Sequence, residues 1–376
     1  MKEFCFEDLV RAYFDCRKHK RNTLNALDFE IDLENNLIKL YNELKDETYE
    51  IGKSICFMVL NPKPREVWAA TFRDRIVHHL VYNAIKDRFY NRFIVDTYSC
   101  IPERGTLNAV RKVKKYAQAV TCNYSKDAYY LKADLRNFFV SIDKEILMQK
   151  LKCYVEEEWI LKLLHKIVYH DPRSNYELRS AESLFRLLPS CKSLWHTPLS
   201  KGLPIGNLTS QFFSNVYLNV LDQYVKHHLK CKYYCRYVDD FIMLDENPRR
   251  LNSWHKDLTV FLKEKLRLDL HQNKRELNKI SRGIDFVGYV IKPKHMLPRQ
   301  KTIKRVFKVM KEYKKSTTWF SQFEINSHRA TINSYLGLFR HINSYNLRRK
   351  MCIKSINLFV GCDDEYTKIF CRFDNP

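Results

Sequence analysis

Hydrophobic and polar positions follow two different periods along this chain, and the changes between them mark the expected elements. Apolar residues spaced three to four positions apart predict helices, whereas runs rich in β-branched and aromatic residues bounded by Gly, Pro or Asn predict strands. The beginning of the chain is expected to hold one basic hairpin among helices. The predicted helices cover 6–15, 24–44, 73–89 and 106–116, and the predicted hairpin covers 55–60 and 65–68 around the turn 61–64.

The rest of the chain shows the same contrast, beginning with a predicted strand at 128–135 that has Asp134 near its end. Ser141 or Asp143 can cap the helix that follows. The pattern then predicts a mostly helical, basic insertion over 146–200. Further predicted elements are a glycine and proline loop over 202–211 that turns into a long helix, strands on both sides of 236–241, a helix over 254–266, a hairpin over 283–291 and basic helices from 301.

The segment Tyr237-Val238-Asp239-Asp240 lies between two runs of strand-forming residues, so it is expected at the tight turn of a hairpin. Two adjacent carboxylates repel each other unless a cation neutralises them, and hard divalent cations prefer carboxylate oxygens. The pair therefore suggests a metal site. Taken alone, however, such a dipeptide is more often a solvated turn, and a third carboxylate is needed to favour the metal.

Asp134 is the candidate for that third carboxylate. A carboxylate at a strand end beside a helix start is a usual place for an active-site group, although a residue there can also simply cap the turn. Three carboxylates from two strands can hold two divalent ions, which activate an attacking 3′-hydroxyl and stabilise a leaving pyrophosphate. Together, Asp134, Asp239 and Asp240 predict nucleotidyl transfer.

Composition adds a partner to this picture. At 376 residues the chain is long enough for two or three lobes, and its 45% hydrophobic residues with only 8 glycines predict an ordered protein. The formal net charge of +23 indicates a polyanionic partner, for which nucleic acid is the leading candidate. An anionic membrane surface is the rival, but no apolar run reaches spanning length, so no membrane partner is expected.

The cysteines and the first residues indicate the compartment. The 12 cysteines are scattered singly, and the closest pair, Cys231 and Cys235, lacks zinc-knuckle spacing. The first nine residues carry three acidic side chains, unlike a secretory leader. We therefore expect a cytoplasmic protein with buried free thiols rather than disulfides.

The chain resembles a reverse transcriptase, because Tyr237-Val238-Asp239-Asp240 matches that family's YxDD box and other boxes follow in the family's order. Arg65 with 73–77 resembles the fingers motif, 134–139 the first catalytic motif and 286–289 the primer-grip hairpin. The resemblance implies an α+β fold with right-hand polymerase architecture: fingers, a palm with an antiparallel sheet, and a helical thumb. The implied boundaries are N-terminal helices and fingers at 1–125, palm at 126–145, an insertion at 146–200, palm with the primer grip at 201–292 and a basic thumb at 293–376.

The resemblance also implies roles for individual residues. Asp134, Asp239 and Asp240, with the backbone carbonyl of Leu135, would bind two Mg²⁺ ions, which Mn²⁺ could replace. Lys274 matches the family lysine proposed to protonate pyrophosphate as it leaves, the alternative being an ordinary surface lysine.

The incoming nucleotide would meet a second set of side chains. Arg65 and Lys63 would contact its triphosphate. Phe139 lies where the family keeps a bulky ring that collides with a ribose 2′-hydroxyl, so the substrate would be dNTP. Ile205 and Gln211, at the start of the palm helix, would also face the nucleotide, and Gly206 allows close backbone approach.

The loop before the palm helix departs from most of the family, which carries Gln-Gly followed by Ser-Pro where this chain has 205–211. This variant and the segment 192–196 resemble the reverse transcriptases of diversity-generating retroelements. That subtype implies copying of a template RNA into cDNA with errors at template adenines, mutagenic retrohoming in a bacterial or phage setting, and a small basic helical accessory protein. Group II intron and retron enzymes are the nearest alternatives.

A physical cause for such errors is the apolar side chain of Ile205 where other members place an amide. Loss of a discriminating hydrogen bond of about 1 to 3 kcal/mol corresponds to roughly a ten- to hundredfold change in selectivity. Two rival functions stay open on the sequence alone. One is a catalytically silent nucleic-acid-binding relative, which would not need three carboxylates and Phe139; the other is a phage-defence enzyme that polymerises without a template.

Overall fold

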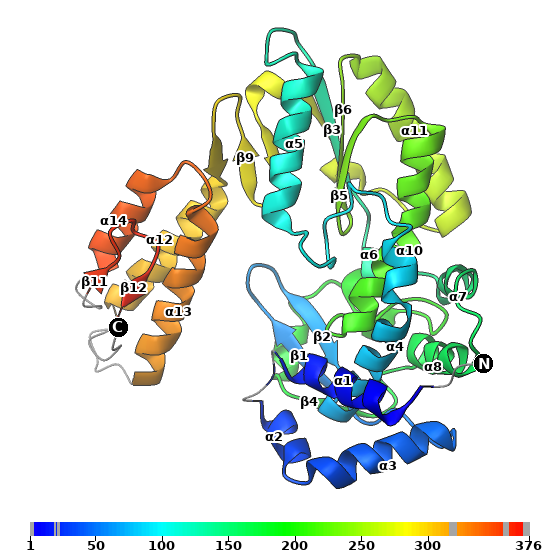
Figure 1. The fold of residues 1–376 in the computed structure, drawn as a ribbon. Coiled ribbons are helices and arrows are strands. Elements are labelled where there is room, and N and C mark those ends of the chain that lie inside the picture. The colour runs from blue at the N-terminus through cyan, green and yellow to red at the C-terminus, as the bar shows by residue number, and fades with distance from the viewer. Residues whose placement is uncertain (1–3, 19, 21–22, 316–321, 356–360, 371–376) are drawn as a thin grey trace. The chain divides into compact units, whose positions relative to one another are not determined.

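The computed structural model describes residues 4–370 except 19, 21–22, 316–321 and 356–360, and the chain divides into two compact units (Figure 1). The first unit comprises Met1–Gly105, Lys132–Phe241 and Asn252–Arg275. The second comprises Thr106–Leu131, Ile242–Leu251 and Glu276–Pro376. Both units are therefore assembled from segments that are distant in the sequence. The sequence-based boundaries for fingers, palm and thumb stay a prediction.

The first unit begins with helices and a small sheet. Helices α1 (Phe6–Arg17), α2 (Leu24–Glu30) and α3 (Leu33–Lys45) precede β1 (Ser54–Val59) and β2 (Arg65–Ala69), which pair antiparallel. Two predictions are corrected here. The helix expected over 24–44 is interrupted at Ile31 and Asp32, and the insertion expected to be mostly helical also contributes the strand β4 (Tyr176–Leu178), parallel to β1.

Two long helices form the interior of the first unit: α4 (Phe72–Tyr90) and α10 (Leu208–Gln223), which pack against each other. Nine α4 side chains are buried, and Thr71 caps its first turn by accepting from the Asp74 backbone N–H. Asp143 caps α7 by accepting from the backbone N–H of Glu145 and Ile146, which confirms one of the two predicted caps. The remaining helices here are α6 (Phe138–Ser141), α7 (Lys144–Lys152), α8 (Glu158–Tyr169), α9 (Glu182–Phe185) and α11 (Pro248–Leu266).

A four-stranded sheet carries the paired aspartates. Its order is β5 (Tyr233–Tyr237), β6 (Asp240–Asp245), β3 (Tyr129–Asp134) and β7 (Glu276–Lys279). The predicted hairpin around 236–241 and the predicted strand ending at Asp134 are thus both present. Strand β3 lies next to β6, so the end of β3 can approach the hairpin turn.

The second unit contains α5 (Thr106–Val120), a three-stranded antiparallel sheet and the C-terminal helices. The sheet order is β10 (Met296–Pro298), β9 (Tyr289–Ile291) and β8 (Ile284–Phe286), and α5 contacts β9. The predicted hairpin at 283–291 corresponds to β8 and β9. The remaining elements are α12 (Gln300–Lys315), α13 (Gln322–Phe339), α14 (Tyr345–Ser355), β11 (Gly361–Cys362) and β12 (Ile369–Phe370).

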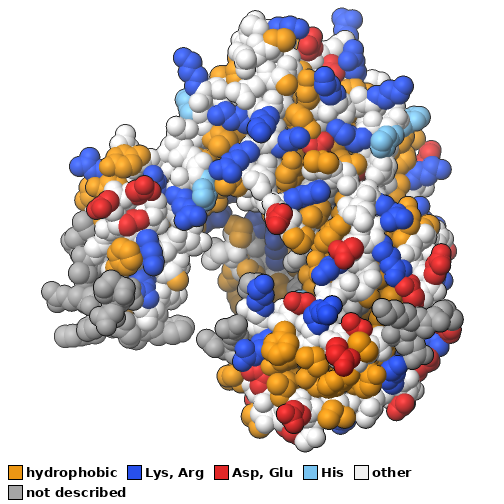
Figure 2. All heavy atoms as spheres, in the orientation of Figure 1, with side chains coloured by type: hydrophobic (Ala, Val, Ile, Leu, Met, Phe, Trp, Pro, Cys, Tyr) orange, Lys and Arg blue, Asp and Glu red, His pale blue; other side chains and the backbone are white. Residues whose placement is uncertain are grey.

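The surface and the thiols only partly follow the sequence-based expectation. Figure 2 shows Lys and Arg side chains gathered over α5 and β9 on the face that it draws. The described cysteines are free, but only five are buried, namely Cys16, Cys56, Cys231, Cys235 and Cys352, so the expectation of generally buried thiols is wrong. Among the described residues, no helix is long and apolar enough to span a membrane.

Candidate active site

The tight turn between β5 and β6 places Val238 and Asp239 at its tip, followed by Asp240 as the first residue of β6. Val238 has φ of 56°, in the left-handed region that β-branched residues rarely adopt. Its carbonyl oxygen accepts a hydrogen bond of 2.9 Å from Arg236 Nη1. The turn is therefore a strained conformation that a buried side chain holds in place.

The structure brings the carboxylates of Asp134, Asp239 and Asp240 close to one another. Asp134 is 6% exposed. Burial, followed by the charges of Asp134 and Asp240, raises the pKa of Asp239 to about 7. Such a shift requires the negative charges to be close neighbours in a poorly solvated place.

Lys274 and Leu135 lie beside this group. Lys274 Nζ forms an ion pair with Asp134 Oδ2, and the backbone N–H of His271 donates to the Asp134 carbonyl oxygen at 2.8 Å. Leu135 is bridged to Leu270 in antiparallel fashion and is buried. The strand end therefore holds the 270–274 segment by its backbone, which places the Lys274 cation against the Asp134 carboxylate.

The loop that contains Ile205 joins two parts of the first unit. The backbone N–H of Leu203 donates to the Phe139 carbonyl oxygen at 2.9 Å, and the backbone N–H of Trp68 in β2 donates to the Ile205 carbonyl oxygen at 2.8 Å. Gly206 has φ of 133°, and a Cβ built on it would lie 2.8 Å from Val67 Cγ1. The loop is therefore fitted closely between the β1–β2 hairpin and the residues after Asp134.

The other predicted nucleotide contacts lie at exposed positions. Lys63 is in the turn of the β1–β2 hairpin and Arg65 is the first residue of β2, paired with Val59. Gln211 is exposed in the first turn of α10, whereas Phe139 is half-buried, with its ring centroid 5.4 Å from that of Phe138. Their contacts with a nucleotide stay a prediction.

The three carboxylates fit a hard divalent cation by their chemistry. Within the described part of the chain, no group of three or more His, Cys, Asp or Glu side chains is arranged to hold a metal ion. Burial and, after it, the charges of Asp134 and Asp240 nevertheless raise the pKa of Asp239. A divalent cation would relieve this repulsion, and oxygen is the donor that Mg²⁺ prefers.

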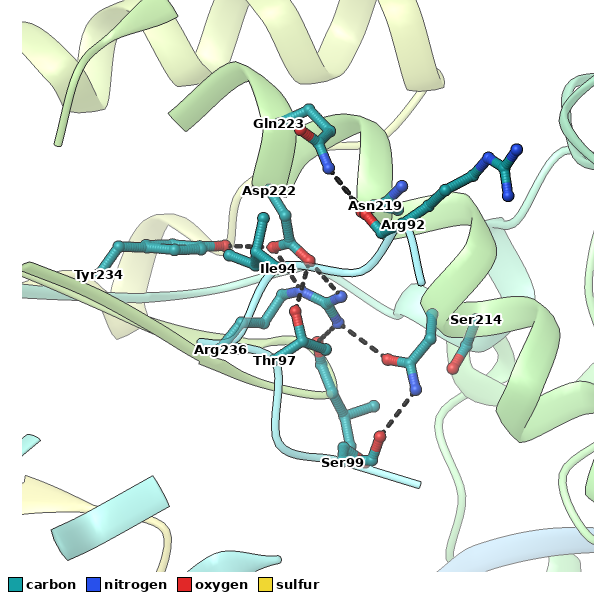
Figure 3. Close-up of polar contacts among 12 residues, drawn as sticks. Arg92, Ile94, Thr97, Ser99, Ser214, Asn219, Asp222, Gln223, Tyr234 and Arg236 are labelled. Atoms are coloured by element: carbon teal, nitrogen blue, oxygen red, sulfur yellow. Dashed lines mark hydrogen bonds and ion pairs between the residues drawn. The ribbon is translucent and has the colours of Figure 1, made fainter. Parts of the chain in front are cut away.

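Sequence reasoning missed the polar contacts that support the turn, drawn in Figure 3. Arg236 and Asp222 are both fully buried and form an ion pair in which Arg236 Nη2 lies 2.6 Å from Asp222 Oδ2. A signal was present, because Arg236 interrupts a strand of aromatic residues and Asp222 follows Leu221 on the apolar side of a helix. Charged residues at core positions of two elements indicate a buried pair.

Comparisons with known proteins place this site in a family. A family model described as reverse transcriptase (RNA-dependent DNA polymerase) matches residues 61–291. Protein YkfC of Escherichia coli is 23% identical over 261 residues, which cover 61% of this chain and 63% of that protein. The group II intron-encoded protein LtrA of Lactococcus lactis is 20% identical over 343 residues, which cover 74% of this chain and 52% of that protein.

The chain spans less than two thirds of the length of these relatives. Among solved structures, telomerase from Candida albicans has a TM-score of 0.46 at 11% identity, covering 82% of this chain and 59% of that chain. The observed α+β fold with its antiparallel sheets agrees with the right-hand polymerase architecture expected from the sequence. Since the family model matches more than half of the residues, the chain belongs to the reverse transcriptase (RNA-dependent DNA polymerase) family.

Proposed function

We propose that this chain is an RNA-directed DNA polymerase that copies a template RNA into cDNA from dNTPs by two-metal nucleotidyl transfer. The observation that carries the proposal is the concentration of negative charge around Asp239, to which Asp134 contributes from a separate strand. Binding of nucleic acid alone would not need this arrangement, because it requires positive rather than negative side chains. The family match supports the same reading.

In this proposal the chain's own residues hold and orient the reactants. Asp134, Asp239 and Asp240 would hold two Mg²⁺ ions, helped by the Leu135 carbonyl. The ions would supply activation of the 3′-hydroxyl and charge stabilisation of the leaving pyrophosphate. Lys274, whose Nζ pairs with Asp134, would pass a proton from Nζ to the departing pyrophosphate.

A second set of side chains would select the incoming nucleotide. Lys63 and Arg65 would bind its triphosphate through charge-assisted hydrogen bonds. The Phe139 ring would exclude a ribose 2′-hydroxyl, which makes dNTP the substrate. Ile205 and Gln211 would face the base-pairing nucleotide from the start of α10.

The test is the substitution Asp239→Asn with a matched control, Asp127→Asn. Asp127 forms a solvent-exposed ion pair with Lys279, so its loss should leave polymerisation intact. Asp239→Asn should abolish incorporation of dNTP on an RNA template with a DNA primer, while RNA affinity stays nearly unchanged. If Asp239→Asn still incorporated dNTP, the assignment of the site would be wrong.

We further propose that the enzyme is of the diversity-generating retroelement type, error-prone at template adenines, and works in a bacterial or phage-infected cytoplasm with a small basic helical accessory protein. The Ile205 segment supports this subtype. Group II intron enzymes are the alternative, favoured by the similarity to LtrA. Sequencing cDNA made from a defined RNA template separates the two, because the proposed subtype should show errors concentrated opposite adenines.

The same assay tests the role of Ile205. Ile205→Gln restores an amide, so errors opposite adenines should fall by roughly ten- to hundredfold. Ile205→Leu is the matched apolar control and should keep the error rate of the natural chain. An unchanged error rate in Ile205→Gln would contradict the proposed cause of misincorporation.

A further inference from the structure

Arg236 fixes the turn that carries Asp239, although the proposed function has not yet given this residue a role. It is fully buried, and all three nitrogens of its guanidinium group donate hydrogen bonds (Figure 3). Nε and Nη2 donate to the two oxygens of Asp222 at 2.7 and 2.6 Å. Nη1 donates to Asn215 Oδ1 at 3.2 Å and to the Val238 carbonyl oxygen at 2.9 Å.

Asp222 holds Arg236 in a single orientation. Besides the two bonds from Arg236, its carboxylate accepts from Thr97 Oγ1 and from the Tyr234 hydroxyl, each at 2.8 Å. A carboxylate offers about four acceptor positions, so all of them are used. Asp222 lies in α10 and its partners come from β5 and the segment before Ser99, so rotation of the guanidinium group would break several bonds at once.

The hydrogen bond from Arg236 to the Val238 carbonyl oxygen restrains the backbone next to Asp239, the candidate metal ligand. The Val238 carbonyl belongs to the peptide plane that it shares with the nitrogen of Asp239, because the peptide bond is planar. Fixing the carbonyl therefore fixes the nitrogen and Cα of Asp239, and only rotation about the later bonds of Asp239 can still move its carboxylate. The left-handed φ of Val238 means that the turn would relax without such a restraint.

We propose that Arg236 is a positioning residue: held by Asp222, it sets the Val238–Asp239 peptide and thereby the geometry in which the Asp239 carboxylate meets a divalent cation. The proposal rests on the proposed function, since it assumes that Asp239 binds metal. The competing explanation is that the Arg236–Asp222 pair only stabilises the core. Replacement of a buried ion pair by apolar residues is often neutral for stability, which allows the two explanations to be separated.

The test measures Mn²⁺ binding to the full chain by electron paramagnetic resonance, together with thermal unfolding. The double variant Arg236→Met/Asp222→Leu should bind Mn²⁺ about tenfold more weakly, as is usual for residues that orient a metal ligand. Its thermal unfolding is measured beside the binding, because the variant also removes the acceptor of the Thr97 and Tyr234 hydroxyls. Arg88→Met/Glu157→Leu removes a partly exposed ion pair and should leave Mn²⁺ binding unchanged.

Val238→Gly provides a second readout that a purely structural role would not change. Glycine adopts the left-handed conformation without strain, so loss of Arg236 should weaken Mn²⁺ binding less in a Val238→Gly background. If the apolar double variant does not fold, Arg236→Lys serves instead. It keeps the charge, but a single ammonium group cannot replace the fork that joins Asp222 to the Val238 carbonyl.

A folded double variant or a folded Arg236→Lys variant that binds Mn²⁺ like the natural chain would overturn the inference. So would a natural chain whose Mn²⁺ binding is not weakened by Asp239→Asn. Because metal binding is measured without template or dNTP, a chain that binds Mn²⁺ through Asp239 but incorporates no nucleotide would contradict the proposed function alone.

Discussion

Asp239 combines a candidate metal ligand with an unfavourable electrostatic environment. Burial and the neighbouring carboxylates raise its pKa to about 7, whereas an aspartate in an unfolded chain titrates near pH 4. Between these two pH values the folded chain binds a proton that the unfolded chain does not. The contribution of this group to the free energy of unfolding is therefore greatest below about pH 4 and is lost as pH rises through about 7.

We predict that Asp239→Asn removes this pH dependence. In the presence of EDTA, the free energy of unfolding of the natural chain should fall between pH 5 and pH 8 by on the order of 1 kcal/mol or more relative to the variant. Urea unfolding at the two pH values measures the difference. Excess Mg²⁺ should reduce the fall, because the cation binds the deprotonated native form.

Two results would contradict this prediction. Parallel stability curves for the natural chain and Asp239→Asn would show that Asp239 titrates normally. Loss of the fall in Asp127→Asn would show that the effect is not specific to Asp239, because Asp127 lies in an exposed ion pair and this variant keeps Asp239.

The loop that contains Ile205 depends on one glycine. A Cβ on Gly206 would lie 2.8 Å from Val67 Cγ1 and 3.0 Å from the Trp68 carbonyl oxygen, and φ of 133° is unfavourable for any other residue. Gly337, within α13, has no atom within 4 Å of the equivalent position. Replacement of glycine by alanine should therefore change the free energy of unfolding in opposite directions at Gly206 and Gly337.

We predict that Gly206→Ala lowers the free energy of unfolding by about 1 to 3 kcal/mol. Gly337→Ala should raise it by about 0.5 to 1 kcal/mol, because alanine favours a helix interior. Chemical denaturation of the three chains provides the measurement. A Gly206→Ala chain as stable as the natural one would mean that the loop does not lie against β2.

The sequence predicted elements with a regular helical periodicity of apolar residues, such as α5, and those bounded by turn residues, such as the β1–β2 hairpin. It missed β4 because three residues show no alternation. It also missed the break at Ile31 and Asp32, since apolar residues continue through it. Pairing of distant residues could not be deduced, and the Arg236–Asp222 contact appears only when α10 packs near β5.

For the candidate site, the sequence identified the residues that bear chemistry but not how they come together. The family boxes single out Asp134 and the hairpin, but their proximity depends on the strand order in the sheet, which the sequence does not state. The ion pair of Lys274 with Asp134 likewise depends on the backbone bond from His271 to Asp134. Residues that bear chemistry were thus recognisable from local motifs, whereas those that only orient them were not.

The whole chain carries a charge of +23, which should dominate its affinity for nucleic acid. Lys304 and Lys311 are exposed on α12, where we expect them to follow a phosphate backbone. Counterions released from the nucleic acid make such binding weaken as salt concentration rises. The number of phosphate contacts can therefore be obtained from the slope of log affinity against log salt concentration.

We predict that Lys304→Gln/Lys311→Gln makes the slope of log affinity against log salt concentration shallower by about 0.7 to 0.9 for each lysine. Fluorescence anisotropy with a labelled RNA measures it. Lys162→Gln is the control, because Lys162 is already paired with Glu47 and Glu158. An RNA affinity of the natural chain that is insensitive to salt would contradict the expectation of a polyanionic partner.

The segment Asp96–Tyr98 covers an edge strand that could otherwise pair with another copy of the chain. Strand β5 is the outermost strand of its sheet, and its free side is covered because Arg236 exchanges backbone hydrogen bonds of 3.0 Å with Asp96 and Tyr98. An uncovered outermost strand is a template for aggregation. Thr97 also donates to Asp222 at 2.8 Å, which ties this covering segment to α10, so we expect loss of the Asp222 carboxylate to loosen the cover and favour self-association.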